Sequence, residues 1–261
     1  MCFLLIDVGN TNIKFGLGDA KKVVQAFVLP TNLNETPDSL GLSIYNFLNY
    51  ACPGKHIQAW VVGSVVPLLD KVLEEACYLY GKCPLYFLPA DIPLDIENQY
   101  QQPQEVGADR LLGAYAARKL FPEPTSLIVI DFGTATTFDC VEHNAYLGGL
   151  ICPGLNSSLQ ALALNTAKLP QISLEFRGEN LEIGKNTQHS LNQGMLFGFV
   201  AMVEGLVLRL KKILRPKVKV VATGGLASLL ATATRSIDLV YPELVLEGLR
   251  LAFLNHQHKG V

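Results

Sequence analysis

Two short segments of the sequence, Asp7-Val-Gly-Asn-Thr11 and Asp131-Phe-Gly-Thr-Ala135, have the same form. In each, an apolar run typical of a buried strand ends at an aspartate, a turn of glycine and small polar residues follows, and a second apolar run begins. One such turn is common in ordinary loops, but these two start 124 positions apart, close to half of the 261-residue chain. The repetition predicts two copies of one unit of strands and helices, with the two turns facing each other across a cleft.

The pattern of apolar residues around each turn predicts a similar order of elements in the two halves. In the first half we expect strands at residues 2–6, 13–17, 23–29, 59–62 and 85–88, and helices at 36–49, 66–80 and 108–120. A loop rich in Pro and Gln covers residues 93–104. In the second half we expect strands at 126–131, 136–141, 146–151 and 218–222, and helices at 155–164, 187–214, 226–232 and 244–253. The sequence therefore predicts an α/β protein.

The segment Phe121-Pro-Glu-Pro-Thr125 separates the two halves, because two prolines in four residues end a helix and rarely continue a strand. We place the domain boundary here, with one domain over residues 1–121 and the other over residues 122–261.

The amino-acid composition limits the classes of protein to which the chain can belong. Hydrophobic residues make up 49% of the chain and charged residues 17%, which is enough apolar surface to fold around a core. The net charge of −2 argues against broad binding to nucleic acid. We expect no membrane association, because no apolar stretch reaches the roughly 18 residues of a spanning helix. The six cysteines lack metal-ligand spacing, so we interpret them as apolar fillers in a reducing, cytoplasmic compartment.

The two turns suit the phosphates of a nucleotide. Glycine lets a backbone approach a phosphate closely, and the hydroxyls of Thr11 and Thr134 are short donors beside it. Because Asp7 and Asp131 would repel a phosphate, their expected task is to hold a hydrated cation, Mg²⁺ or a monovalent ion, that bridges to it. The alternative is that each aspartate only stabilises its own turn. The Walker-type phosphate loop, the dinucleotide fingerprint and the hydrolase nucleophile elbow are all absent from the sequence.

A third segment, Gly107-Ala-Asp109-Arg110, opens a predicted helix. The helix dipole favours a carboxylate in the first turn by roughly 0.3–1 kcal/mol, so Asp109 would stay ionised and could accept a proton from a substrate hydroxyl. Arg110 could clamp a carboxylate or phosphate with its planar fork. On their own, these residues are equally consistent with a helix N-cap beside a solvated arginine. Together with two phosphate turns, they indicate a kinase.

The sequence resembles the type III pantothenate kinases, a family within the superfamily of sugar kinases and actin-like ATPases. The resemblance covers about residues 4–249 and rests on motifs in order: Asp7-Val-Gly-Asn-Thr-Asn12, Ser64-Val-Val-Pro67, Tyr100, Gly107-Ala-Asp-Arg110, Asp131-Phe-Gly-Thr-Ala-Thr136, Gly148-Gly-Leu-Ile-Cys-Pro-Gly154, Gly184-Lys-Asn-Thr187 and Thr223-Gly-Gly225. It implies two duplicated ribonuclease H-like (actin-like ATPase) domains with a nucleotide cleft. It also implies ATP-dependent phosphorylation of pantothenate to 4'-phosphopantothenate, the first step of coenzyme A biosynthesis.

The resemblance also implies roles for particular residues. Asp109 would be the general base, Asp131 would bind a monovalent cation (K⁺ or NH₄⁺), and the turn at Thr223 would lie on the adenosine side. Mg²⁺ would accompany ATP. The ATP-binding residues would be Asp7, Val8, Gly9, Asn10, Thr11, Asn12, Ile13, Lys14 and Thr134. The pantothenate-binding residues would be Tyr100, Gly107, Ala108, Asp109, Arg110 and Thr187.

The family is homodimeric, with an acceptor site shared between subunits, and the predicted helix after Thr187 has a feature that would suit such an interface. Gly194 and Gly198 lie four residues apart and clear one face, although the same face could pack inside its own domain. Two alternatives to the main prediction remain. One is a kinase for another small hydroxylated acceptor, and the other is a non-catalytic accessory or regulatory member of the same family.

Overall fold

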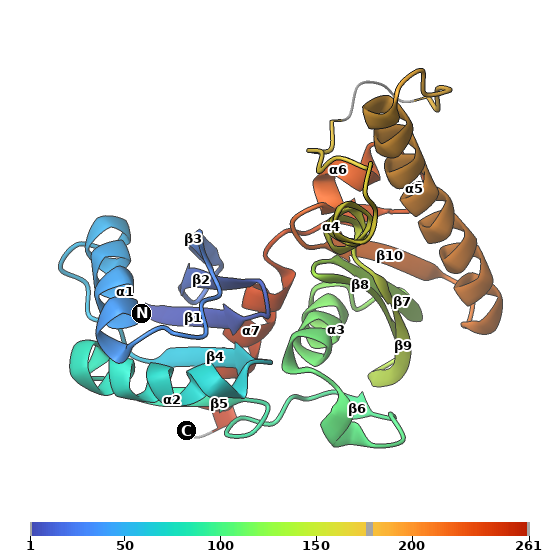
Figure 1. Cartoon of the computed structure of the whole chain (residues 1–261). Helices are drawn as coiled ribbons and strands as arrows, with labels where there is room; N and C mark the ends of the chain where they lie inside the picture. Colours follow the sequence, from blue (N-terminus) through green and yellow to red (C-terminus); the bar gives the residue numbers. More distant parts are fainter. Residues whose placement is uncertain (1, 176–179, 260–261) are drawn as a thin grey trace. The chain divides into compact units, whose positions relative to one another are not determined.

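The computed structural model describes residues 2–175 and 180–259, which form two compact units (Figure 1). The first unit comprises Met1–Ile96, Gln101–Lys119 and Glu243–Val261, and the second comprises Glu97–Tyr100 and Leu120–Pro242. The division after Lys119 falls next to the predicted boundary at residue 121. The end of the chain differs from the prediction, because residues 243–261 group with the first unit and not with the second.

The first unit contains a five-stranded sheet in the order β3-β2-β1-β4-β5. Strand β2 pairs antiparallel with both β1 and β3, whereas β4 pairs parallel with both β1 and β5. All six residues of β1 are buried, which explains its nearly continuous apolar sequence. The strands are β1 (Phe3–Val8), β2 (Asn12–Gly18), β3 (Val23–Pro30), β4 (Trp60–Ser64) and β5 (Leu85–Leu88).

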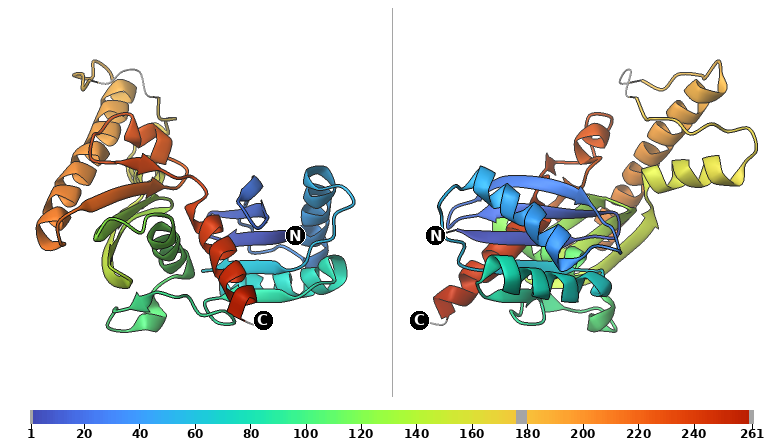
Figure 2. Two further views of the ribbon diagram at one scale, coloured as in Figure 1. Left: turned by 180° about the vertical axis from the view of Figure 1, so that it is seen from behind. Right: turned by 60° about the vertical axis from the view of Figure 1, so that its left-hand side comes forward.

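Helices cover this sheet on both faces (Figure 2). On one face, α1 (Pro37–Ala51) lies beside α2 (Pro67–Ala76), and α1 begins with a capping box in which Thr36 and Ser39 bond each other's backbone N–H. On the other face, α7 (Leu244–Lys259) contacts β1, β2 and β4. The backbone of Gly248 in α7 also lies against Leu112 of α3 (Ala108–Leu120). These contacts explain why the last helix belongs to the first unit, and sequence order alone could not show them.

The second unit contains a six-stranded sheet in the order β11-β10-β7-β8-β9-β6. Its strands are β6 (Glu97–Asn98), β7 (Ser126–Phe132), β8 (Ala135–Glu142), β9 (Ala145–Pro153), β10 (Val218–Thr223) and β11 (Leu239–Val240). Its helices are α4 (Leu155–Asn165), α5 (Thr187–Ile213) and α6 (Ala227–Ala231). Side chains from the helices and from the sheet form one hydrophobic core in this unit. Val203 of α5 packs in the same cluster as Ile128 of β7 and Val220 of β10.

The two sheets have the same connectivity. In the second unit β8 pairs antiparallel with β7 and β9, and β10 pairs parallel with β7 and β11. Strands β7 to β11 therefore repeat β1 to β5 one for one, with β6 added parallel to β9 at the edge. The predicted duplicated α/β fold is confirmed, and both Asp-x-Gly turns stand at the corresponding place, after the first strand of each sheet.

Three elements differ from the sequence prediction. The helix predicted over 66–80 ends at Ala76 and continues as a π-helical turn, η1 (Cys77–Gly81). The predicted loop 93–104 contains the short strand β6, and it leads into a 3₁₀ turn, η2 (Pro103–Glu105). Strand β11 was not predicted at all. Both short strands depend on pairing with distant residues, which local sequence does not encode.

Helix α5 departs from the expectation that no apolar stretch reaches the length of a membrane span. By length and composition alone, it is the one helix among the described residues that could cross a membrane. Its side chains Leu196, Val203 and Val207 are nevertheless buried in the core of the second unit. The same length and composition therefore suit a core helix.

Candidate active site

The first Asp-x-Gly turn joins β1 to β2. Asp7 lies between Lys14 of β2 and Gly63 of β4 in the sheet, and only 8% of its surface is exposed. The N–H of Gly9 donates to the carbonyl of Asn12 at 3.0 Å, which closes a tight hairpin. The three residues of its tip, 10–12, are exposed at the end of this strand pair.

Thr31, just after β3, anchors this turn. Its hydroxyl donates to the carbonyl of Gly9 at 2.6 Å, and its N–H donates to the carbonyl of Thr11 at 2.9 Å. Both acceptors belong to the turn predicted to bind phosphate. Thr31 was not predicted as part of the site, because nothing in its local sequence indicates a partner 22 residues earlier.

The predicted acceptor segment lies next to the same turn. Asp109 stands in the first turn of α3, where its Oδ1 accepts the backbone N–H of Arg110 at 2.8 Å. A Cβ on Gly107 would lie 2.5 Å from that Oδ1 and 3.3 Å from Val65. Since the N–H of Val65 donates to the carbonyl of Val8 at 3.0 Å, the Asp109 segment and the end of β1 share one neighbour.

The second Asp-x-Gly turn joins β7 to β8. Asp131 lies between Thr137 of β8 and Thr223 of β10, and the N–H of Gly133 donates to the carbonyl of Ala135 at 3.1 Å. Thr134 at the tip is exposed, as a phosphate donor should be.

The start of α4 supports this second turn. Gly154 comes so close to the carbonyl of Thr134 that a Cβ at this position would collide with it, and the hydroxyl of Ser157 donates to the same carbonyl at 2.7 Å. The N-terminus of the 11-residue α4 therefore lies beside the turn, where its unpaired N–H groups favour an anion. Gly154 belongs to a motif quoted in the sequence analysis, but no role was predicted for it or for Ser157.

The turn after β10 lies against the carboxylate of Asp131. Gly224 has a φ of +91°, and a Cβ there would collide with Oδ1 of Asp131 and come within 2.7 Å of the Phe132 backbone. Glycine is needed at this position for both reasons. One oxygen of the Asp131 carboxylate thus lies against the backbone of this turn. A carboxylate oxygen is the kind of ligand that a hard cation such as K⁺ takes. No cluster of three acidic, His or Cys side chains occurs among the described residues, so protein side chains alone form no closed metal cage there.

Tyr100 belongs to the second unit, although Asp109 belongs to the first. Its ring packs against the backbone of Gly148, which has a φ of +112° and where a Cβ would lie 3.2 Å from the ring. The ring centroid of Tyr146 is 6.4 Å away, and the hydroxyl of Tyr146 donates to Asp139 at 2.9 Å. Tyr100 is thus held on the edge of the second sheet by glycine and aromatic contacts.

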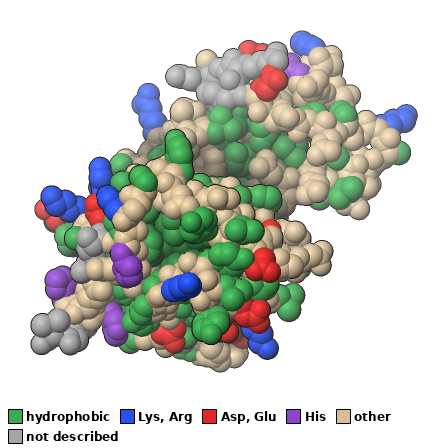
Figure 3. All heavy atoms as spheres, turned by 90° about the vertical axis from the view of Figure 1, so that its left-hand side faces the viewer, with side chains coloured by type: hydrophobic (Ala, Val, Ile, Leu, Met, Phe, Trp, Pro, Cys, Tyr) green, Lys and Arg blue, Asp and Glu red, His purple; other side chains and the backbone are tan. Residues whose placement is uncertain are grey.

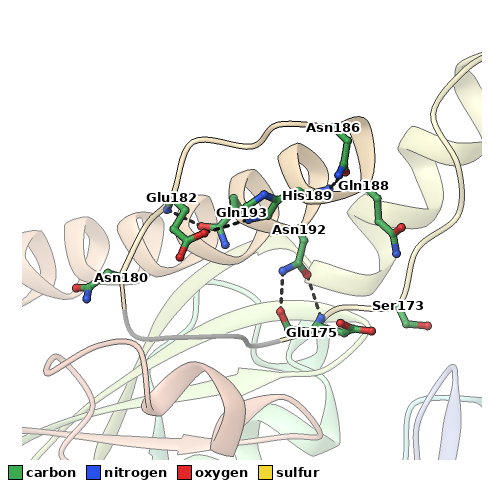
Figure 4. Close-up of a pocket in the computed structure, with 9 residues that line it drawn as sticks. All are labelled: Ser173, Glu175, Asn180, Glu182, Asn186, Gln188, His189, Asn192 and Gln193. Carbon is green, nitrogen blue, oxygen red and sulfur yellow. Dashed lines mark hydrogen bonds and ion pairs between the residues drawn. The ribbon is translucent and has the colours of Figure 1, made fainter.

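Thr187 is the first residue of α5 and is exposed. The side chain of Asn186 caps this helix by accepting the N–H of His189 at 2.8 Å. A cavity of about 410 Å³ lies beside the same helix start (Figure 4). Asn192 and Gln193 line it and bond the backbone of Glu175 and Glu182 respectively, so the polar segment before α5 is fastened to the helix. Thr187 itself is not among the residues that line the cavity.

Within the first unit, the Gly107–Arg110 segment and the end of β1, where the Asp7–Lys14 turn begins, share Val65 as a neighbour. Within the second unit, Asp131 and Thr134 lie on one hairpin, which is supported by the start of α4 and by the turn at Gly224. Tyr100 and Thr187 lie elsewhere in the second unit.

Solved structures share this architecture. A Baf family protein from Campylobacter jejuni aligns over 98% of this chain and all of its own, with a TM-score of 0.61 and 18% identity. A ROK hexokinase from Thermus thermophilus aligns with the same coverage, a TM-score of 0.53 and 16% identity. The fold is therefore that of the sugar kinases and actin-like ATPases, as predicted.

Sequence comparison narrows this class to one family. The sequence model of the type III pantothenate kinases matches residues 3–209, and the chain belongs to this family. A type III pantothenate kinase of Oleidesulfovibrio alaskensis is 49% identical over 260 residues, which are 99% of this chain and 98% of the relative. One from Nitratidesulfovibrio vulgaris (strain Miyazaki F) is 51% identical over 255 residues, with 97% of both chains covered. The predicted family is confirmed.

Proposed function

We propose that the protein transfers the γ-phosphoryl group of ATP to the primary hydroxyl of pantothenate and so makes 4'-phosphopantothenate for coenzyme A biosynthesis. Membership of the family gives the reaction. One observation in the structure carries the assignment to particular residues. The segment that opens with Gly107 is packed against Val65, which is itself bonded to the last residue of β1. This packing supports an acceptor carboxylate next to a phosphate turn.

Asp109 is the proposed general base. Its Oδ1 is held by the N–H of Arg110 at 2.8 Å, which orients the carboxylate and leaves Oδ2 to accept the hydroxyl proton as the oxygen attacks. Arg110 beside it is suited to the carboxylate of pantothenate, because its guanidinium forms paired hydrogen bonds with such groups. The remaining contribution to catalysis is positioning, as in phosphoryl transfer generally.

The two hairpin turns are the proposed phosphate sites. The exposed tip 10–12 and Thr134 supply donors, and the N-terminus of α4 adds favourable partial charge. Asp7 would hold the hydration shell of the Mg²⁺ that accompanies ATP. Asp131 would hold the monovalent cation, K⁺ or NH₄⁺. When bound, these cations neutralise charge on the phosphates.

We also propose a homodimer in which Tyr100 and Thr187 complete the acceptor site. Support comes from α5, where a Cβ added to Gly194 or Gly198 would meet nothing within 4 Å. Among the described residues the two glycines thus face open space, which favours admission of a second backbone over packing inside their own unit. Gly198→Leu should convert a dimer to a monomer in light scattering. Lys211→Leu, which the 3.6-residue period turns away from both glycines, should leave the dimer intact.

Mass spectrometry of pantothenate incubated with the protein, ATP and Mg²⁺ tests the reaction. We expect a product heavier by one phosphoryl group, formed faster with K⁺ than with Na⁺ at equal ionic strength. Asp109→Asn should lower kcat by roughly 10²–10⁴-fold while ATP still binds. Glu105→Gln, an exposed carboxylate four residues earlier, is the matched control and should keep full activity.

Two results would contradict the proposal. Unchanged turnover in Asp109→Asn would remove Asp109 from the role of base. A folded wild-type protein that binds ATP but yields no product with either salt would favour another acceptor or the non-catalytic alternative.

A further inference from the structure

Four of the six cysteines lie in or against the core of the first unit, and two of them are joined by a tight turn. Cys77 begins the π-helical turn η1, and Cys83 lies two residues before β5. Lys82 between them has a φ of 49°, and its N–H donates to the carbonyl of Cys77 at 2.8 Å. This left-handed residue ends the helix and folds the chain back, which brings Cys83 beside Cys77.

The two cysteines are in contact. The Sγ of Cys77 lies 3.4 Å from the carbonyl oxygen of Cys83, and its single S–H can donate to that carbonyl or, once Cys83 is ionised, to the Cys83 sulfur. Cys77 is 2% exposed, whereas Cys83 is partly exposed. An oxidant can therefore reach Cys83 from solvent, and Cys77 is positioned behind it as the second sulfur.

The environment makes the two sulfurs unequal. The hydrogen bond from Cys77 lowers the pKa of Cys83, because it stabilises the thiolate. The same bond, together with burial, raises the pKa of Cys77. The more exposed cysteine is thus also the better nucleophile, as in proteins where one cysteine reacts first and a neighbour resolves the product.

We propose that Cys77 and Cys83 form a redox-active dithiol that hydroperoxides oxidise to an intramolecular disulfide. The Cys83 thiolate attacks one oxygen of hydrogen peroxide, the O–O bond breaks, and a sulfenic acid and water result. The Cys77 sulfur, after giving up its proton, then attacks the Cys83 sulfur and expels the oxygen as a second water. In total, two thiols lose two protons and two electrons, and the peroxide takes up both and is reduced to two waters.

The side chain of Trp60 lies near this cysteine pair, so its fluorescence can report the oxidation state of the pair. Trp60, the single tryptophan of the chain, is fully buried. A Cβ added to Gly81 would lie 3.0 Å from the indole Nε1 of Trp60 and 3.1 Å from the Sγ of Cys77. The indole and the Cys77 thiol therefore lie close to each other, on either side of Gly81. Disulfides quench indole fluorescence by accepting an electron, which thiols do far less well. Oxidation of this pair should therefore dim the emission of Trp60.

The reactivity of the other two cysteines of this unit, Cys2 and Cys52, can be compared with that of Cys83. Burial, followed by the nearby Cys2, raises the pKa of Cys52, and its Sγ donates to the carbonyl of Leu48 at 3.2 Å. A buried thiol with a raised pKa is a poor nucleophile. We therefore expect the Cys52 thiol to react more slowly than Cys83.

Peptide mapping tests the proposal directly. Trypsin cleaves after Lys82, so digestion without reductant separates residues 72–82 from residues 83–110 unless a disulfide joins them. After treatment of the folded protein with hydrogen peroxide, we expect these two peptides to remain linked, with the mass of two hydrogen atoms lost. Dithiothreitol should separate them. Separate peptides, or a link between residues 2 and 52 in their place, would overturn the proposal.

Variants and fluorescence give a second readout that does not depend on the kinase reaction. Peroxide should dim Trp60 emission in the wild type, and dithiothreitol should restore it. Cys83→Ser should abolish the change, and the matched control Cys2→Ser should retain it. Equal dimming in Cys83→Ser would show that another group quenches the indole and would overturn the assignment. These outcomes are separate from the proposed function, because they require neither ATP nor pantothenate.

Discussion

The β1–β2 turn of the first unit and the β7–β8 turn of the second start from the same sequence pattern but are held in place by different neighbours. The first is tied to the end of β3 by both the hydroxyl and the N–H of Thr31. The second is backed by the start of α4, where Gly154 and Ser157 contact the Thr134 carbonyl. A strand end therefore supports one turn, and a helix N-terminus supports the other.

The two aspartates differ in the same way. Asp7 is buried opposite Gly63 within the sheet, whereas Asp131 is partly exposed and faces the left-handed backbone of Gly224. A duplicated fold has thus kept one pattern of turn residues and changed what surrounds it. The environment, and not the Asp-x-Gly motif itself, distinguishes the site proposed for Mg²⁺–ATP from the site proposed for K⁺.

The largest expected effect comes from exchanging the two carboxylates for amides. Asp131→Asn should lower kcat/KM by roughly 10²-fold or more and abolish the response to K⁺, because the carboxylate is the proposed cation ligand. Asp7→Asn should lower the rate to a similar extent but keep the ratio of rates in K⁺ and Na⁺. Initial rates in a KCl titration at constant ionic strength measure both. If the two variants respond alike to K⁺, the two turns do not differ in the way described.

A smaller effect is expected from the backbone that faces Asp131. Gly224→Ala should lose about 1–3 kcal/mol of stability, since the new methyl group meets the carboxylate and the Phe132 backbone at a positive φ. Gly225→Ala is the matched control and should change stability by no more than about 0.5 kcal/mol, because nothing lies within 4 Å of its added Cβ. Urea denaturation compares them. Equal stability of the two variants would show that Gly224 is not restricted by Asp131.

The side-chain supports of the two turns should matter less. Thr31→Val removes the hydroxyl bond to Gly9, and Ser157→Ala removes the bond to Thr134. Each substitution should lower the free energy of unfolding by about 1 kcal/mol, the usual net contribution of one hydrogen bond. We expect the KM for ATP to rise about fivefold in each, as that energy implies. If the KM of one variant is unchanged, ATP binding does not depend on the hydrogen bond that was removed from that turn.

The smallest effect concerns the next hairpin of each unit. In the β2–β3 turn, hydrogen bonds from the N–H groups of Lys22 and Lys21 hold the pKa of Asp19 below its usual value of 3.8. The corresponding β8–β9 turn contains His143 with a φ of 49° and has no such carboxylate at its tip.

A carboxyl group whose pKa is lowered in the folded state stabilises the fold above the unfolded pKa and loses this contribution as the pH falls through the folded pKa. The difference in Tm between the wild type and Asp19→Asn should therefore be small and present at pH 7. It should shrink as the pH drops below 3.8. A difference that grows in acid would contradict the lowered pKa.

The sequence predicted the parts of the fold that are encoded locally. Apolar runs located β1, β2, β7 and β8, and the apolar spacing over residues 36–49 located α1. Tertiary pairing determined the rest. Strand β6 exists because Glu97 bonds the carbonyl of Asn144, and β11 exists because it pairs with β10. The C-terminal helix could not be assigned to the first unit from chain order, since its partners are β1, β2 and β4.

The residues of the candidate site also fall into two groups, those that local sequence predicted and those that it did not. The glycines and aspartates of the two turns were recognisable because their types and spacing are unusual, and the acceptor segment because it joins a carboxylate to a helix start. Thr31 and Ser157 were missed, because an isolated threonine or serine carries no sign of a distant carbonyl partner. The residue roles taken from the family resemblance, among them that of Thr187, remain predictions.

The placement of α7 has a consequence for how the protein is made. Every strand of the second unit lies before residue 243, but the first unit lacks α7, which covers β1, β2 and part of β4, until the residues after that point have been translated. On the ribosome, the second unit can therefore complete its core while β1 and β4 still expose an apolar surface. The half of the chain that is synthesised first would be the last to mature, and chaperones would meet its uncovered sheet.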